Sequence, residues 1–351
     1  MKIMVTGNMG YIGPCLVKQL RSTYSTATII GFDIGYFGNC LTTKDLLPEC
    51  RVDHQYFADI RQFPEEILGG VDAIVHLAGV SNDPIGNRFE EVTFDINYRA
   101  SINLAKKAKD AGVTSFVYAS SCSMYGFADD SPRTEKSPLN PLTAYAKSKA
   151  FTERDLEPLA SNQFKITCLR FSTACGWSDR LRLDLVLNDF VAGAIASRRI
   201  TILSDGTPWR PLINVRDMAR AIDWAISRRT DCGGKFLAVN VGSDEWNYQV
   251  KDLAEGVAKV ILDVDISINK NAQPDKRSYR VNFGLFRKLA PANQPTVDLI
   301  ESIKELKNGL ESMGFIDGDF RNSKYMRLKV LTELQEKGLL NQRLQWIKMV
   351  C

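Results

Sequence analysis

The chain has 351 residues, of which 44% are hydrophobic and 25% charged, and a formal net charge of +4. This length can bury a sizeable core in one large domain or two unequal ones. No block of like charges points to nucleic acid, the first residues do not resemble a signal peptide, and no apolar run reaches transmembrane length, so we expect neither nucleic acid nor a membrane as partner.

Eight cysteines are spaced irregularly and form no Cys-x-x-Cys pair, and the chain has only two histidines. A disulfide framework is not expected in a chain of this length, and a zinc site lacks ligands, so no metal is predicted. Thiols that stay reduced predict a cytoplasmic protein.

Short apolar strands alternate with helical patterns through the first half of the chain. Strands are predicted at 2–6, 28–33, 72–79, 115–121 and 165–172, and helices at 11–22, 88–111 and 142–160. Continuous apolar strands separated by helices predict a parallel sheet that is covered on both faces. The predicted fold class is therefore α/β, a Rossmann-type doubly wound parallel sheet.

After about residue 175 the alternation becomes irregular. Helical spacing recurs at 180–197, 296–314 and 323–337, and 207–227 is typical of a strand followed by a helix. We predict a dinucleotide-binding domain over 1–175, to which 206–243 returns. Residues 176–351 are expected to form mainly a smaller mixed α/β substrate-binding lobe and carboxyl-terminal helices.

The stretch VTGNMGYIG places Gly7, Gly10 and Gly13 between the first strand and the first helix. Glycines at this point let the backbone approach a pyrophosphate, and the helix N-terminus offers free N–H groups and a positive dipole. A tight turn without a ligand is the alternative. The position in the first strand–turn–helix unit favours a dinucleotide site.

Acidic residues follow the next two strands. Asp33 ends the second strand about 20 residues past the glycines, where a carboxylate accepts hydrogen bonds from both adenosine ribose hydroxyls and repels a 2′-phosphate. Asp33 therefore favours NAD over NADP. Asp59 could contact the adenine or simply cap a helix.

Tyr145 and Lys149 lie four residues apart on a predicted helix, so their side chains share one face. An ammonium near a phenol stabilises the phenolate, and Tyr145 could then remove a proton from an alcohol as hydride leaves for the cofactor. A Tyr-x-x-x-Lys pair alone is usually a surface pair, but here it follows a dinucleotide motif.

Together these motifs resemble the extended short-chain dehydrogenase/reductase superfamily and, within it, the sugar-nucleotide epimerase and dehydratase group. Five stretches appear in the family's order and approximate spacing: TGNMGYIG (6–13), GFD (31–33), HLAG (76–79), SSCSMYG (120–126) and YAKSK (145–149). The resemblance implies NAD as cofactor, a nucleotide-diphosphate sugar as substrate and a homodimer formed through helices 88–111 and 142–160.

The resemblance also assigns site residues. Ser121 would hydrogen-bond the reacting hydroxyl, Ser120 would lie nearer the cofactor, and Asn97 would support the active site. Other predicted cofactor contacts lie within or beside the motifs: Tyr11, Ile12, Ile60, Leu77, Ala78 and Gly79. Ser123 shares the side of Ser121 in an extended segment and would face the sugar.

The two residues after Ser121 bear on the reaction. The 4,6-dehydratases of the family carry an acid there, whereas this chain has Cys122 and Ser123, which argues against a 4,6-dehydratase. Cys122 is read as a small residue packed behind the strand end rather than as a nucleophile.

Substrate contacts in the second lobe follow from the same resemblance. Thr173 stands where the family often has an Asn, and Arg210 matches the arginine that binds the diphosphate, a group that suits a guanidinium fork. Arg182 and Arg277 are further candidates, although each arginine could be a solvated surface charge. The stretches SDRLRLDLVLNDF (178–190) and PDKRSY (274–279) are similar to GDP-heptose 4-dehydrogenases.

The predicted activity is NAD-dependent oxidation of a ring hydroxyl, at C4, of a nucleotide-diphosphate sugar, with an epimerase or a 4-dehydrogenase as the outcome. Asp33 argues against an NADPH-dependent keto-sugar reductase. The presence of both Tyr145 and Lys149 argues against a catalytically silent NAD-binding regulatory or scaffold protein.

Overall fold

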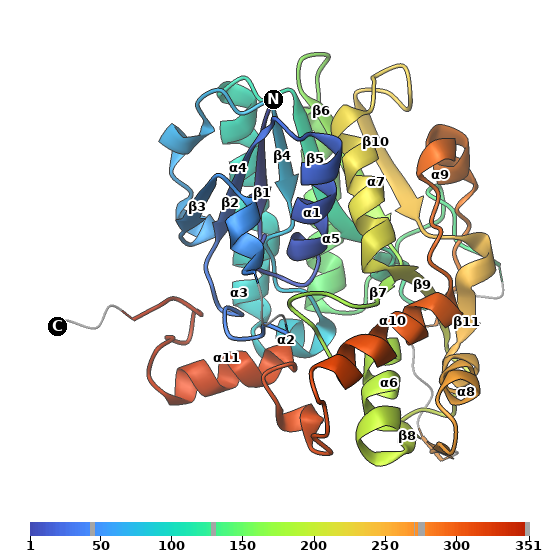
Figure 1. The fold of residues 1–351 in the computed structure, drawn as a ribbon. Helices are drawn as coiled ribbons and strands as arrows, with labels where there is room; N and C mark the ends of the chain where they lie inside the picture. The colour runs from blue at the N-terminus through green and yellow to red at the C-terminus, as the bar shows by residue number, and fades with distance from the viewer. Residues whose placement is uncertain (43–45, 128–130, 270, 273–277, 348–351) are drawn as a thin grey trace.

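The computed structural model describes residues 1–42, 46–127, 131–269, 271–272 and 278–347. The predicted apolar runs form one seven-stranded sheet in which all neighbouring strands are parallel, in the order β10-β6-β5-β4-β1-β2-β3 (Figure 1). Its strands are β1 (Lys2–Thr6), β2 (Thr28–Asp33), β3 (His54–Phe57), β4 (Ala73–His76), β5 (Ser115–Ser121), β6 (Lys165–Phe171) and β10 (Phe236–Val241). The strand order reverses beside β1, which is the doubly wound arrangement.

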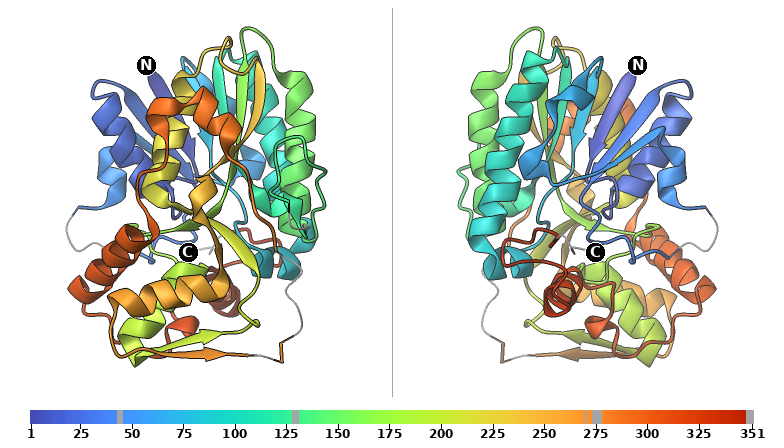
Figure 2. Two further views of the ribbon diagram at one scale, coloured as in Figure 1. Left: turned by 90° about the vertical axis from the view of Figure 1, so that its right-hand side faces the viewer. Right: turned by 90° about the vertical axis from the view of Figure 1, so that its left-hand side faces the viewer.

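Helices cover both faces of this sheet, as Figure 2 shows. One face packs on α4 (Ala100–Asp110) and α5 (Ala144–Leu156), and the other on α1 (Gly13–Thr23) and α7 (Val215–Ser227). The strands are apolar on both sides because each side contributes to a separate core. The α/β class predicted from the sequence is confirmed.

The helix predicted over 88–111 is interrupted by a wider turn. It consists of α3 (Glu90–Phe94), a π-helical segment (Asp95–Arg99) and α4, and it follows the short α2 (Asp83–Arg88). Within the π segment, Asn97 accepts a hydrogen bond from the Val80 N–H at 2.7 Å and donates to the Val80 carbonyl at 2.9 Å. The side chain thereby fixes the loop after β4.

The second lobe contains two small sheets. One has the order β11 (Asn247–Gln249), β9 (Trp209–Asn214), β7 (Thr173–Cys175), with one antiparallel and one parallel pair, and the other pairs β12 (Asp265–Ile268) with β8 (Arg199–Ile202). The remaining α-helices are α6 (Val186–Ser197), α8 (Val250–Val260), α9 (Gly284–Leu289), α10 (Leu299–Ser312) and α11 (Arg327–Glu336). The mixed α/β character expected of this lobe is confirmed.

The helix predicted over 180–197 begins only at Val186. The preceding residues form an irregular connection in which Arg180 is 1% exposed and forms an ion pair with Glu49 at 2.8 Å. Arg182 is 6% exposed, so it is not the solvated surface charge that was the alternative interpretation of it. The connection is not helical. It is held in place by the ion pairs of Arg180 and Arg182 and by a hydrogen bond from the Leu183 N–H to the Tyr325 carbonyl.

The two lobes exchange segments. The strand β10 and the helix α7 belong to the first lobe by their packing, while Leu331, Leu340 and Leu344 near the carboxyl terminus join the core beneath α4 and α5. The domain limits drawn from the sequence remain a prediction. In the described ranges the seven cysteines are free, and no helix there has both the length and the apolarity to cross a membrane.

One consequence for stability concerns His76 at the end of β4. Its ring nitrogens lie 2.6 Å from Thr6 Oγ1 and 2.7 Å from Ser101 Oγ, and burial lowers its pKa to about 3. In the unfolded chain the imidazole of His76 is protonated near its ordinary pKa of about 6.5, whereas in the folded protein it stays neutral down to about pH 3. The free energy of unfolding therefore decreases as the pH falls from about 6.5 towards 3. We expect His76→Gln to lose less stability than the wild type when urea unfolding is compared at about pH 7.5 and about pH 5.

The exposed His54 provides the control, because His54→Gln should retain the wild-type dependence on pH. Parallel losses in the wild type and in His76→Gln would contradict a role of His76 in acid sensitivity.

Candidate active site

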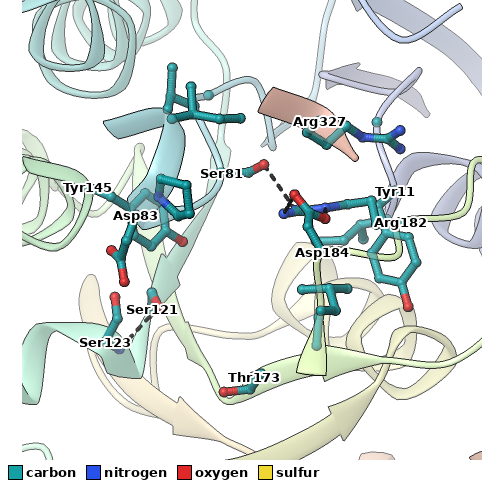
Figure 3. Close-up of a pocket in the computed structure, with 18 of the residues that line it drawn as sticks. Tyr11, Ser81, Asp83, Ser121, Ser123, Tyr145, Thr173, Arg182, Asp184 and Arg327 are labelled. Carbon is teal, nitrogen blue, oxygen red and sulfur yellow. Dashed lines mark hydrogen bonds and ion pairs between the residues drawn. The ribbon is translucent and has the colours of Figure 1, made fainter. Parts of the chain in front are cut away.

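A cavity of about 710 Å³ opens at the carboxyl ends of the parallel strands, where α/β sheets bind ligands. Both lobes contribute to its wall (Figure 3). Most of the residues predicted to form the site line it: Gly7, Gly10, Tyr11, Ile12, Asp33, Asp59, Ile60, Leu77, Ala78, Gly79, Ser120, Ser121, Ser123, Tyr145, Lys149, Thr173, Arg182 and Arg210. Gly13 and Asn97 do not reach the wall, and Arg277 lies outside the described residues.

The glycine loop packs closely against neighbouring backbone at Gly7 and Gly13. Gly7 has a φ of +75°, and a Cβ there would lie 2.5 Å from the backbone nitrogen of Ala78. At Gly13 a Cβ would lie 1.9 Å from the Asn8 carbonyl oxygen, so this glycine serves the packing of the loop against α1. No side chain caps the N-terminus of α1, which leaves its N–H groups available for a phosphate.

The two acidic residues after β2 and β3 differ in their partners. Asp33 accepts hydrogen bonds from the backbone N–H groups of Met9 at 3.0 Å and Gly35 at 2.7 Å, and burial raises its pKa. Asp59 forms an ion pair with Arg61 at 2.5 Å and caps the 3₁₀ helix Ile60–Gln62. The glycine loop and Asp33 thus fit the diphosphate and ribose of a dinucleotide, whereas Asp59 performs the helix-capping role that was the alternative for it.

Ser121, Tyr145 and Lys149 meet on one wall of the cavity. Ser121 ends β5, while Tyr145 and Lys149 lie one turn apart on α5, whose packing against β5 brings the three together. The Lys149 ammonium lies 5.7 Å from the centroid of the Tyr145 ring and donates to the Ala119 carbonyl at 2.7 Å. A phenol, a hydroxyl and an amine converge on one point, which is the arrangement that proton transfer to or from a bound alcohol needs.

Burial is the largest influence on the pKa values of Tyr145 and Lys149 in the protein without ligands. It raises the pKa of the Tyr145 phenol, and a hydrogen bond with Ser121 opposes that rise. It lowers the pKa of the Lys149 ammonium to about 8, with Glu153 acting in the opposite direction. The phenol is therefore protonated in the free protein, and a further positive charge is needed to ionise it near neutral pH.

The hydroxyl group of Ser123 is buried and has no hydrogen-bond partner among the described residues. In Figure 3 it lies beside Ser121, and its backbone N–H donates to Ser121 Oγ at 3.1 Å. Cys122 points to the other side, is fully buried and donates its thiol to the Arg170 carbonyl at 3.1 Å. Burial raises the pKa of this thiol above its usual range, so Cys122 is a packing residue.

The second lobe supplies Thr173 from β7 and Arg210 from β9. Arg182 also lines the cavity, but its guanidinium is already neutralised by Asp184 at 2.9 Å and donates to Ser81 Oγ at 3.0 Å. An arginine held in this way is less available to a diphosphate than one without a carboxylate partner.

Asp83 lines the cavity and was missed by the sequence analysis. It is the first residue of α2, its Oδ1 accepts a hydrogen bond from Thr143 Oγ1 at 2.6 Å, and its charge raises the pKa of Tyr145. Figure 3 shows its carboxylate near Tyr145 and Ser123. Its place after the buried strand β4 was the only local signal, because the carboxyl ends of parallel strands share one edge of the sheet.

Known proteins are similar to this chain in sequence and in fold. A UDP-glucose 4-epimerase of Arabidopsis thaliana is 29% identical over 269 residues, covering 69% of this chain and 75% of that protein. Two solved structures share the fold. One is a UDP-glucose-4-epimerase from Stenotrophomonas maltophila with bound NAD (TM-score 0.75, 21% identity, 90% of this chain and 99% of that one). The other is the NAD-dependent NDP-hexosamine 5,6-dehydratase TunA (TM-score 0.75, 22% identity, 91% and 99%).

The family model of the NAD dependent epimerase/dehydratase family matches residues 3–242, which is more than half of the 351-residue chain. The matched region holds the glycine loop, Asp33 and the Ser121–Tyr145–Lys149 group. The chain belongs to the NAD-dependent epimerase/dehydratase family, and its cofactor is NAD.

Proposed function

We propose that this protein oxidises a ring hydroxyl, at C4, of a nucleotide-diphosphate sugar and acts as an epimerase or as a 4-dehydrogenase. The observation that carries the proposal is the meeting of Ser121, Tyr145 and Lys149 on the wall of the cavity that also contains the glycine loop. The relationship to UDP-glucose 4-epimerases supports the same class of substrate.

In this proposal, Tyr145 is the general base. Bound NAD+ supplies the hydride acceptor and a positive charge. That charge and the Lys149 ammonium oppose the burial that raises the pKa of the Tyr145 phenol, so the phenolate becomes accessible near neutral pH. Ser121 hydrogen-bonds to the reacting oxygen as it changes from hydroxyl to carbonyl, and the buried hydroxyl group of Ser123 is placed to bind a neighbouring group of the sugar.

The fate of the keto-sugar separates the two outcomes. If it turns in the cavity and hydride returns to its other face, the product is an epimer and NAD+ is regenerated in place. If it leaves, the enzyme is a 4-dehydrogenase and needs a second substrate to reoxidise NADH. The UDP-glucose 4-epimerase relatives favour the first outcome, while the resemblance to heptose 4-dehydrogenases favours the second.

The prediction that the enzyme is not a 4,6-dehydratase remains part of the proposal. It rests on Cys122 and Ser123, which carry no carboxyl group. Asp83 brings a carboxylate to the same wall, and one neighbour by fold is a 5,6-dehydratase, so loss of water must be measured rather than assumed.

The test is product analysis with the purified full-length protein and a panel of UDP-, GDP- and dTDP-sugars. We expect one sugar nucleotide to give either a 4-epimer of unchanged mass or a 4-keto product with rising absorbance of NADH. A product lighter by one water would show that the enzyme is a dehydratase. If no sugar nucleotide of the panel were converted, the proposal that the substrate is a sugar nucleotide would be wrong.

Assembly and location remain predictions. We propose a homodimer formed through α4, α5 and the helical segments before α4. Phe151 on α5 is 36% exposed and stacks with Phe94, with ring centroids 5.9 Å apart, so an apolar surface is available at this position. A cytoplasmic location is likewise proposed from the reduced thiols.

A further inference from the structure

The carboxyl-terminal segment 327–347 follows the region matched by the family model and returns to the cavity. It begins with α11, whose Leu331 packs in the core of the first lobe, and Leu340 and Leu344 follow in the same core; all three are at most 3% exposed. Arg327, Leu331 and Leu344 line the cavity. Nothing in the sequence alone indicates a role for these residues.

Residues 339–347, which we call the strap, lie across the loop that follows β2. The Tyr36 hydroxyl donates a hydrogen bond to the Leu344 carbonyl, and the Trp346 indole N–H donates to the Ile34 carbonyl at 2.7 Å. The rings of Tyr36 and Trp346 are also in contact, with centroids 5.9 Å apart. This loop begins directly after Asp33, so the strap is fixed to the part of the site that would hold the adenosine ribose.

The strap is also tied to the loop after β3 and to the π-helical segment. Arg61, which is bound to Asp59, donates to the Arg343 carbonyl at 2.7 Å. The Arg343 guanidinium forms an ion pair with Asp95 at 2.6 Å. The strap is therefore attached at three points around the predicted adenosine end of the cavity.

Arg327 is the polar residue of this segment that lacks a full set of partners. It is 1% exposed, donates from Nη2 to the Arg180 carbonyl at 2.9 Å, and lies over the Phe37 ring at 4.5 Å from its centroid. Its Nη1 atom has no hydrogen-bond partner, and no carboxylate of the described residues forms an ion pair with it. Arg182, by contrast, is neutralised by Asp184.

A buried guanidinium without an ion pair is costly, because burial removes its hydration and a single bond to the Arg180 carbonyl replaces only part of it. Burial accordingly lowers the pKa of Arg327 to about 10. The presence of such a group on a cavity wall is explained if an anionic ligand accepts its hydrogen bonds and neutralises its charge. A diphosphate offers the acceptor oxygens and the negative charge that a guanidinium fork binds best.

We propose that Arg327 and the strap form a clasp for the cofactor, in which the Arg327 guanidinium binds the diphosphate of NAD and the strap retains its adenosine half. Figure 3 places Arg327 on the side of Tyr11 of the glycine loop, across the cavity from Ser121, Ser123 and Tyr145. This position favours the diphosphate of the dinucleotide over that of the sugar nucleotide. The inference rests on the use of NAD and not on the identity of the sugar.

The first test compares Arg327→Met with Lys329→Met, which removes an exposed cation from the same helix. We expect the Kd of NAD+ to rise at least about tenfold in Arg327→Met, the scale of one charge-assisted hydrogen bond, and to stay unchanged in Lys329→Met. The Kd of UDP, the probe for the sugar-nucleotide diphosphate, should stay unchanged in both variants. Both values are measured by calorimetry without any sugar substrate.

Thermal unfolding of the ligand-free variants distinguishes ligand binding from a structural role. Removing an uncompensated buried cation should leave the midpoint of Arg327→Met unchanged or raise it, although affinity for NAD+ falls. A lower midpoint together with unchanged affinity for NAD+ would assign Arg327 to the fold alone. A weaker affinity for UDP with unchanged affinity for NAD+ would assign it to the substrate instead.

The second test concerns the strap. Trp346→Ala removes the bond to Ile34 and the contact with Tyr36, and we expect NADH to dissociate several-fold faster, as followed by its fluorescence after mixing with excess NAD+. Ile316→Ala, a change at an 86% exposed residue that does not line the cavity, is the control. An unchanged dissociation rate in Trp346→Ala would overturn retention by the strap, whatever the sugar substrate proves to be.

Discussion

Replacing Tyr145 by Phe is expected to lower kcat by at least about 10²-fold, the usual contribution of a positioned general base. The substitution removes one hydroxyl and keeps the ring on which Lys149 acts at 5.7 Å. Because the phenol takes part in proton transfer, the loss should appear in kcat, while NAD+ still binds. The measurement is the rate of conversion of the sugar nucleotide that the wild type turns over, together with a binding titration of NAD+.

The exposed Tyr56 on β3 supplies the matched change, since Tyr56→Phe removes the same hydroxyl from a residue that does not line the cavity. Its kcat should equal that of the wild type. An active Tyr145→Phe enzyme would mean that another group removes the proton, with Asp83 as the first residue to replace, since it is the carboxylate whose charge acts on Tyr145.

Replacing Arg170 by Leu is expected to destabilise the protein by about 3–5 kcal/mol, the effect of breaking a buried ion pair from one side. Arg170 on β6 and Glu153 on α5 are 7% and 4% exposed, and two guanidinium nitrogens lie 2.7 and 3.0 Å from the same carboxylate oxygen. The variant leaves Glu153 buried without its partner, one helical turn from Lys149. Urea unfolding curves analysed at a common m value measure the change.

Arg154→Leu is the control on the same helix, because its pair with Asp155 is exposed and its loss should leave the midpoint unchanged. Removing both charges of the buried pair, as Glu153→Met with Arg170→Met, should restore most of the stability lost in Arg170→Leu, since no unpaired charge is then left behind. If Arg170→Leu unfolds at the wild-type urea concentration, the pair does not stabilise the contact between α5 and β6.

The parts of the site that the sequence predicts are those that local geometry governs. Gly7 requires a positive φ in a strand–turn–helix unit, Asp33 ends a strand of unmistakable apolar pattern, and Tyr145 and Lys149 share a helix face through the 3.6-residue period. At Gly7 the spacing along the chain already indicates the backbone conformation, and at the other three residues it indicates the direction of the side chain. The structure places all four residues on the cavity wall.

Other features depended on contacts between distant segments. The pattern of residues 180–185 suits a helix, yet the segment is irregular because Arg180 pairs with Glu49 of the first lobe. The sequence did not predict that Asp83 lies beside Tyr145, because α2 and α5 come into contact only when the sheet has folded. The rise in the pKa of Tyr145 likewise follows from burial, which no spacing of residues reports.

By itself, the sequence determined the α/β class, because periodicity and turn residues encode backbone direction over a few residues. Through its resemblance to the family it also predicted NAD as the cofactor and proposed Ser121, Tyr145 and Lys149 as the catalytic group. Only the tertiary structure decided that Arg182 is neutralised, that Arg327 is buried without an anion, and that the strap lies over the adenosine end. The physical reason is that charge compensation and burial are set by partners brought together by folding, often from opposite ends of the chain.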